Sequence, residues 1–336
     1  MRRAVIDDIV FQAAPLGERA AAWPPLLSVH LSAGTHHKGF TQPLPLFARR
    51  APMPPGDANW AAYCGLLKDL GIPLQTTAAS LESLSVANVP VRFARRGCDE
   101  GFDALELETA EAIEISCGRR LPSATIAQFP LEISAWHELK LLIDTLRELS
   151  SSGTSIGLGL VAGDVGADIA NALAARADFV ILEMPSASIH TEPSAAELDV
   201  LVWSAVAARA ACIHANAPGF PIYVDAALTR ADDLIKLLAL GASAVSIDAL
   251  AHACLPPTTA PAASYPKGML SGIGGLPKPA AANVSPLENR LTGLIAALKS
   301  RLQQQQLGNV HDLGLNQLRA LSEGAARLAA IQLLGH

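Results

Sequence analysis

The stretch "YVDAALTRADDLIKLLALGASAVSIDAL", residues 223–250, decides the fold, because it runs from strand through turn and helix to a second strand. Apolar residues at helical spacing predict the helix over 230–241, and "SAVSID" (243–248) reads as the second strand. This order of elements is typical of a phosphate-binding segment, yet its turns carry Ala, Asp and Arg where such loops usually carry glycine. Strands with continuous apolar runs are buried on both faces, which is typical of a parallel sheet.

The same alternation of strand and helix repeats upstream. Strands are predicted at 72–77, 111–116, 155–160, 178–184, 220–225 and 243–248, and helices at 60–71, 134–150, 165–177, 194–215 and 230–241. Ser134 is predicted as the N-cap of the helix over 134–150, with Glu138 near the capping-box position. The first hundred residues have room for the missing units, and the total then matches the ~250 residues of a TIM barrel. We therefore expect an α/β protein with a (β/α)8 TIM barrel rather than an open doubly wound sheet, and no GxGxxG follows a strand.

The regions outside the regular alternation differ in composition. Residues 1–60 form an irregular, proline-rich segment that is expected to contribute strands to the barrel, whose main body is 61–254. A loop rich in Pro, Gly and Ala follows over 255–286. Residues 287–336 are predicted to form an appended helical hairpin. Its second helix is expected over 313–333.

Charge and composition exclude several classes of function. The net charge is −6 and no basic block exceeds a pair, so nucleic acid is not an expected partner. No apolar run is long enough for a bilayer and no signal peptide is recognisable, so no membrane contact and a cytoplasmic location are expected. The five cysteines are scattered without metal-binding spacing, so free thiols and no metal site are expected. The oligomeric state is left open.

Three acidic residues are predicted at strand ends. Glu183, Asp225 and Asp248 end neighbouring strands at the carboxyl-terminal end of the barrel, here called the mouth, where barrel enzymes place their catalytic groups. Together they would form a pocket for a cation, a metal or an amine, or a pair for general acid–base catalysis. The alternative is that they cap helices and bind loop N–H groups.

Other polar residues give weaker signals. His36 and His37 are adjacent, and their side chains point to opposite sides of an extended segment, so a shared metal is not expected. His190 and His214 are isolated and are interpreted as structural. Arg120, with its neighbour Arg119, would meet an anionic substrate or else be solvated.

Four segments together resemble a known family. They are "IEISCGRRLPSATI" (113–126), "GDVGADIANALAARADFVIL" (163–182), "VDAALTRADDLIKLLALGASAVSIDA" (224–249) and the C-terminal "LTGLIAALKSRL" with "LGNVHDLGLNQLRALSEGAARL". In order and spacing they resemble the FMN-binding (β/α)8 domain of glutamate synthase and its short stand-alone relatives. The resemblance covers roughly two thirds of the chain. It implies an FMN-dependent oxidoreductase of glutamate and amino-acid nitrogen metabolism.

The residues depart from that family where it binds its cofactors. The resemblance places FMN phosphate on Ala226, Ala227, Ser246 and Ala249, with Arg120 as the added charge. Alanines stand there in place of glycines, and Asp248 would repel a phosphate, so the phosphate site is predicted to be lost. No lysine is present near 155–163 to contact a flavin. Cys254 alone cannot hold an iron–sulfur cluster, so none is expected.

These departures favour a divergent glutamate-synthase-like barrel with an accessory or binding role or an altered chemistry. A small-molecule ligand at the mouth is the expected partner. A working FMN-dependent oxidoreductase of glutamate synthase type is the alternative. A third interpretation is that the C-terminal helices dock onto a protein partner.

Overall fold

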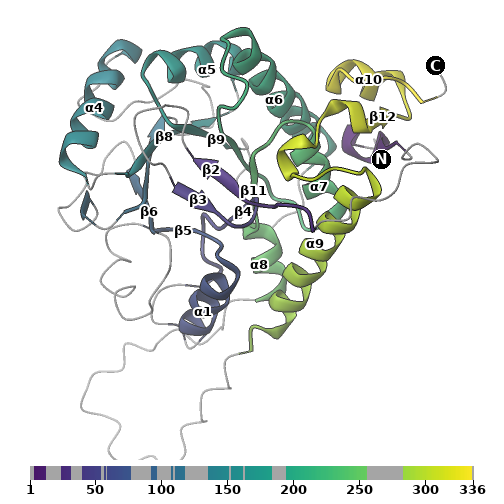
Figure 1. Ribbon diagram of the computed structural model, residues 1–336, viewed down its shortest axis with the longest axis horizontal. Coiled ribbons are helices and arrows are strands. Elements are labelled where there is room, and N and C mark those ends of the chain that lie inside the picture. The colour runs from purple at the N-terminus through teal and green to yellow at the C-terminus, as the bar shows by residue number, and fades with distance from the viewer. Residues whose placement is uncertain are drawn as a thin grey trace, which may run out of the picture.

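The computed structural model describes residues 4–12, 24–31, 40–53, 57, 59–76, 92–96, 107–108, 110–117, 135–150, 153–161, 163–183, 194–255 and 283–334. Within them, eight parallel strands form one sheet (Figure 1). In chain order these are β4 (Leu46–Phe47), β5 (Leu74–Thr76), β6 (Arg92–Arg96), β7 (Ala112–Cys117), β8 (Ser155–Val161), β9 (Phe179–Glu183), β10 (Ile222–Asp225) and β11 (Ala244–Ser246). The (β/α)8 barrel predicted from the sequence is confirmed.

The sheet closes on itself next to its first strand. Strand β4 pairs with β11 on one side, and a parallel bridge joins Ala48 to Leu74 on the other. Ala48 N–H donates to the Pro73 carbonyl at 2.9 Å, and Gln75 N–H donates to the Ala48 carbonyl at 2.7 Å. The barrel is therefore closed by Ala48, which follows the two-residue strand β4. The residues after Ala48 belong to the mouth.

Helices surround the barrel, as Figure 1 shows. They are α1 (Trp60–Leu70), α4 (Trp136–Leu149), α5 (Val165–Ala174), α6 (Ala195–His214), α7 (Ala231–Ala239) and α8 (Asp248–Cys254). Every residue of β7, β9, β10 and β11 is buried, as their apolar runs predicted. None of the helices in the described part of the chain is both long and apolar enough to cross a bilayer.

Helix starts are only partly predictable from capping residues. Ser194 forms a capping box with Glu197 at the start of α6. The prediction of Ser134 as the N-cap of α4 is wrong, because that helix begins after Ala135, which offers no side-chain oxygen. Glu138 does lie in the first turn of α4, where its charge suits the helix dipole.

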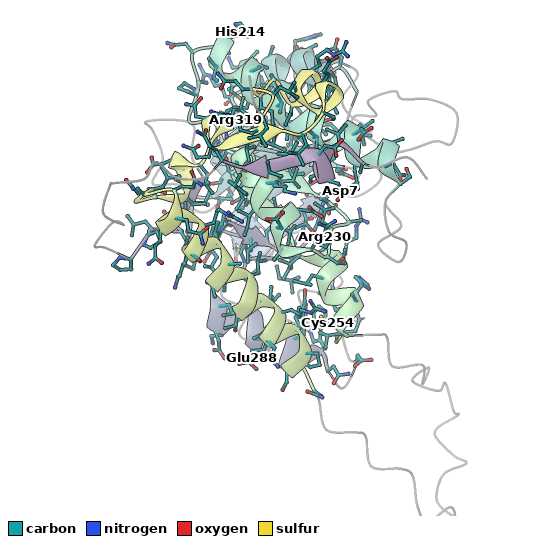
Figure 2. All side chains as sticks on the ribbon, turned by 90° about the vertical axis from the view of Figure 1, so that its right-hand side faces the viewer. Asp7, His214, Arg230, Cys254, Glu288 and Arg319 are labelled. Carbon is teal, nitrogen blue, oxygen red and sulfur yellow. The ribbon has the colours of Figure 1, made fainter. Side chains whose placement is uncertain are left out.

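The two ends of the described chain lie side by side (Figure 1). Strand β1 (Ile9–Phe11) pairs antiparallel with β12 (Leu318–Ala320). The short helix η1 (Val5–Asp8) precedes β1, and its Asp7 forms an ion pair of 2.9 Å with Arg230 at the start of α7 (Figure 2). In the same N-terminal region, β2 (Val29–Leu31) and β3 (Phe40–Gln42) form an antiparallel pair.

The predicted C-terminal hairpin is correct only in its first helix. Helix α9 (Ser285–Gln304) packs against α7 and α8 through Leu287, Leu291, Leu294, Leu298 and Leu302. The second helix expected over 313–333 is absent. The short helices η2 (Val310–Asp312) and η3 (Leu315–Gln317), strand β12 and helix α10 (Glu323–Ala329) occupy that segment. Pairing with β1 overrides the helical pattern of this sequence.

Candidate functional site

Arg49 lies at the mouth, two residues after the end of β4, and its side chain is fully buried. Its Nη1 donates to Asp225 Oδ2 at 2.9 Å, and its Nη2 donates to Glu114 Oε1 at 2.5 Å and also to Glu183 Oε1. Its Nε donates to Gln75 Oε1 at 2.9 Å. These five residues, Arg49, Gln75, Glu114, Glu183 and Asp225, form what we call the arginine–carboxylate cluster.

The sheet register and one glycine bring these side chains together. Asp225 of β10 lies beside Glu183 of β9 in the register of the two strands. Glu114 reaches the same point from the middle of β7, because Gly159 of β8 leaves room for it. A Cβ at Gly159 would overlap the Glu114 carboxylate and lie 3.1 Å from Glu183 Oε1. The glycine therefore creates the space in which the cluster forms.

Three acidic side chains surround one cation in this cluster. Burial alone would lower the pKa of Arg49, but the charges of Glu114, Glu183 and Asp225 outweigh this effect and raise that pKa above its ordinary value. Removing one partner of such a buried ion pair would leave an uncompensated charge, so the residues of the cluster depend on one another. In the described part of the chain, no three His, Cys, Asp or Glu side chains are arranged to hold a metal ion.

Asp248, at the start of α8, fixes the backbone that carries the two arginines. Its Oδ1 accepts the N–H of Arg49 and its Oδ2 accepts the N–H of Arg50, both at 2.8 Å. Burial, followed by the charge of Asp225, raises the pKa of Asp248 to about 8, against the opposing effect of the Arg49 N–H and both guanidinium charges. Asp248 therefore acts on the site through the backbone of the segment after β4.

Arg50 extends from this fixed backbone to the opening of the mouth. Its Nη2 lies 3.3 Å from Asp225 Oδ2, and 26% of its side chain is exposed. Asp225 thus contacts both arginines, with Arg49 on the buried side and Arg50 on the solvent side.

The three predicted carboxylates do meet in one mouth. Glu183 and Asp225 share the Arg49 guanidinium, and Asp248 binds the Arg49 backbone. Their proximity was predicted, but Asp248 begins α8 and does not end a strand as expected. Their catalytic role stays a prediction. The sequence reasoning missed Arg49, Gln75 and Glu114. An acidic residue inside the apolar run "AIEISC" (112–117) and a basic pair after "LF" were the available signals.

The phosphate-binding positions inferred from the family resemblance form a closed corner. Ala226, Ser246 and Ala249 are buried, and Ala227 is half-buried. The Asp248 N–H already donates to Ser246 Oγ at 3.2 Å, and the Asp248 carboxylate fills the space towards β4. The Asp248 side chain in this corner is already occupied by the N–H groups of Arg49 and Arg50, so these residues do not fit the phosphate of FMN.

Several predicted site residues are not part of the mouth as described. Arg119, Arg120, His36, His37 and His190 lie outside the described residues. His214 is exposed at the last turn of α6. In Figure 2 it lies at the end of the molecule opposite Cys254, which ends α8.

Comparison with known proteins rests on structure alone. No family model matches the chain, and no curated protein sequence matches it. A flavocytochrome b2 mutant with pyruvate bound is similar over 97% of this chain and 79% of that chain, with a TM-score of 0.62 and 12% identity. A soluble mutant of (S)-mandelate dehydrogenase from Pseudomonas putida is similar over 94% and 88%, with a TM-score of 0.56 and 15% identity. The flavin-binding domain of baker's yeast flavocytochrome b2 gives 94% and 77%, with a TM-score of 0.60 and 14% identity.

These neighbours correct the family resemblance. They are FMN-dependent α-hydroxy acid dehydrogenases, a different family of FMN barrels from glutamate synthase. The glutamate-synthase interpretation is therefore wrong, both as a divergent accessory protein and as a working enzyme of that type. It rested on the order and spacing of strands and helices, which barrels of different families share. At identities of 12–16% the neighbours establish the fold of this chain.

Proposed function

We propose that the mouth of this barrel binds a small 2-hydroxy acid, with Arg50 as the residue that binds its carboxylate. The observation that carries the proposal is the placement of Arg50. Its backbone N–H is held by Asp248 at 2.8 Å, its guanidinium lies 3.3 Å from Asp225, and a quarter of its side chain faces solvent. An arginine held at its backbone and at its guanidinium loses little further side-chain entropy when it binds a carboxylate.

The pairing of Arg50 with Asp225 selects the ligand class. A guanidinium matches a carboxylate in two parallel hydrogen bonds. An ionised aspartate only accepts hydrogen bonds, so it favours a ligand hydroxyl over a ligand carbonyl. A 2-hydroxy acid carries a carboxylate and a hydroxyl on adjacent carbons and satisfies both residues at once. Arg49, buried beneath Asp225, keeps that carboxylate in place.

The solved structures support the broader class of 2-hydroxy and 2-oxo acids. Flavocytochrome b2 variants were solved with pyruvate and with benzoylformate bound, and another neighbour is (S)-mandelate dehydrogenase. Pyruvate, benzoylformate and mandelate are all small acids with an oxygen on the carbon next to the carboxylate.

The proposal is tested by titration calorimetry of the purified protein. We expect lactate and mandelate to bind more tightly than pyruvate and benzoylformate, and acetate to bind most weakly. Arg50→Ala should weaken mandelate binding about tenfold or more, because a hydrogen bond to a charged group contributes about 1.5–3 kcal/mol. Arg327→Ala, at an exposed arginine on α10, is the matched control and should leave binding unchanged. Equal affinities in wild type and Arg50→Ala would remove the proposal.

FMN-dependent oxidation of such an acid is the second candidate function. The flavin enzymes among the neighbours favour it, and the closed corner at Asp248 argues against it. Absorbance from 300 to 500 nm and titration with FMN distinguish the two. A colourless protein that ignores FMN but binds mandelate would support acid binding without flavin. Micromolar binding of FMN would overturn our conclusion about the corner.

A further inference from the structure

We propose a second ligand site at the opposite, amino-terminal end of the barrel, for a small organic acid with an apolar body. A cavity of about 640 Å³ lies there, between the end of α6, the residues that enter β10 and β11, and the segment 310–315. Its volume is in the range of small-molecule sites. It is lined by residues that precede the strands, such as Pro221 and Ser243, whereas the mouth is built from residues that end them.

Arg209 supplies the positive charge of this cavity. Its guanidinium donates to the carbonyls of Pro218 at 2.6 Å, Gly241 at 2.6 Å and Phe220 at 3.3 Å. Within the described residues, no carboxylate forms a salt bridge with Arg209. Carbonyl groups satisfy its donors but carry no formal charge, so the cation is oriented without being neutralised. An anion entering the cavity would supply the missing charge.

Gly241 fixes the loop that holds this arginine. Its φ of +117° is rarely adopted by other residues, and a Cβ there would lie 2.8 Å from Arg209 Cβ. The glycine therefore lets its carbonyl approach the guanidinium. The loop geometry and the placement of Arg209 depend on each other.

Two further polar groups line the cavity beside Arg209. Ser243 Oγ accepts the Ile222 N–H at 3.1 Å and an Arg209 N–H at 3.3 Å, so its own hydrogen is left to donate to a ligand oxygen. His311 Nε2 lies 3.1 Å from the Ser28 carbonyl, which fixes the proton on that nitrogen because a carbonyl only accepts. Both residues belong to the cavity lining.

The remaining walls are apolar. Leu238, Val310, Leu313 and Leu315 line the cavity, and Ile213 stands at its rim with 58% of its surface exposed. An apolar wall facing one cation favours a ligand with a hydrocarbon body and a single acidic group, such as a medium-chain carboxylate. This inference is independent of the function proposed for the mouth.

The test uses hexanoate as the probe, followed by titration calorimetry and by displacement of the fluorescent anion 8-anilinonaphthalene-1-sulfonate. Ile213 is exposed, so it can be changed without disturbing the core. We expect Ile213→Glu to weaken hexanoate binding about tenfold and Ile213→Lys to strengthen it, because the two variants place opposite charges at the rim of a cavity that an anion must enter. Leu149→Glu, at an equally exposed leucine that ends α4, is the matched control and should bind as wild type does.

Each outcome decides the proposal. Opposite shifts for the two Ile213 variants, with Leu149→Glu unchanged, support it. Identical binding in both Ile213 variants overturns it, and so does an equal loss in the control. Arg50→Ala must leave hexanoate binding intact, since its loss there would place the acid at the mouth instead.

Discussion

Two arginines at opposite ends of the barrel are held in different ways. Arg49 at the mouth lies among Glu114, Glu183 and Asp225, whereas Arg209 at the amino-terminal end is held by backbone carbonyls and one serine. Burial lowers the pKa of both, but only at Arg49 do carboxylate charges reverse the effect. Hydrogen bonding and charge compensation are thus separate properties of a buried cation. The first fixes its position, and the second decides whether it still attracts an anion.

The largest expected effect follows removal of the cation at the mouth. Arg49→Met takes away the partner shared by three buried carboxylates, which should lower the free energy of unfolding by about 3–5 kcal/mol. Urea unfolding followed by circular dichroism measures this loss. Arg327→Met, at an exposed pair within one helix, should change stability by about 0.5 kcal/mol or less. Equal losses in the two variants would show that the cluster does not stabilise the barrel.

The second prediction concerns pH and Asp248. The pKa of Asp248 is about 8 in the folded protein against an ordinary value of 3.8. Between these two pH values the folded state keeps a proton that the unfolded chain releases. Stability should therefore fall as the pH rises through this window and level off above pH 8. Asp248→Asn removes this contribution, so its stability relative to wild type should shift by about 1.4 kcal/mol per pH unit, or about 3 kcal/mol from pH 5 to 7.

The control for this pH series is Asp144→Asn, at a partly exposed carboxylate on α4. Its unfolding free energy should follow the wild-type pH dependence. If the unfolding free energies of wild type and Asp248→Asn change in parallel with pH, Asp248 titrates near its ordinary value and the prediction is wrong.

The smallest expected effect lies at the amino-terminal end. Arg209→Met leaves the carbonyls of Pro218 and Gly241 without their donor, but water reaches this half-buried site. We expect a loss of about 1–3 kcal/mol in the free energy of unfolding. We expect the loss in unfolding free energy to be larger for Arg49→Met than for Arg209→Met. A larger loss for Arg209→Met than for Arg49→Met would contradict it.

The sequence predicts the barrel well and the cluster only in part. Runs such as "FVIL" (179–182) are buried on both faces, so their pattern indicates parallel strands directly. Glu183, Asp225 and Asp248 were placed together because parallel strands end at one edge. Arg49 was missed because β4 has two residues and lies in a proline-rich segment, where periodicity carries no information.

The errors share one physical cause, which is distance along the chain. The helix predicted over 313–333 is interrupted where Leu318–Ala320 pairs with Ile9–Phe11, about three hundred residues earlier. The spacing of apolar residues within 313–333 cannot predict that pairing, because it carries no information about residues 9–11. The family resemblance likewise rested on local segments, and the structural neighbours belong to a different family.

The pairing of β1 with β12 also constrains how this protein is made. The ribosome releases Ile9–Phe11 long before Leu318–Ala320 emerges, and β4 must likewise wait for β11 to cover its edge. During synthesis both strand edges stay open to other chains, which is the condition under which nascent proteins aggregate. The molecule therefore completes this pairing only after Leu318–Ala320 has been translated, so the two early strands remain without their partners for most of the synthesis of residues 1–320.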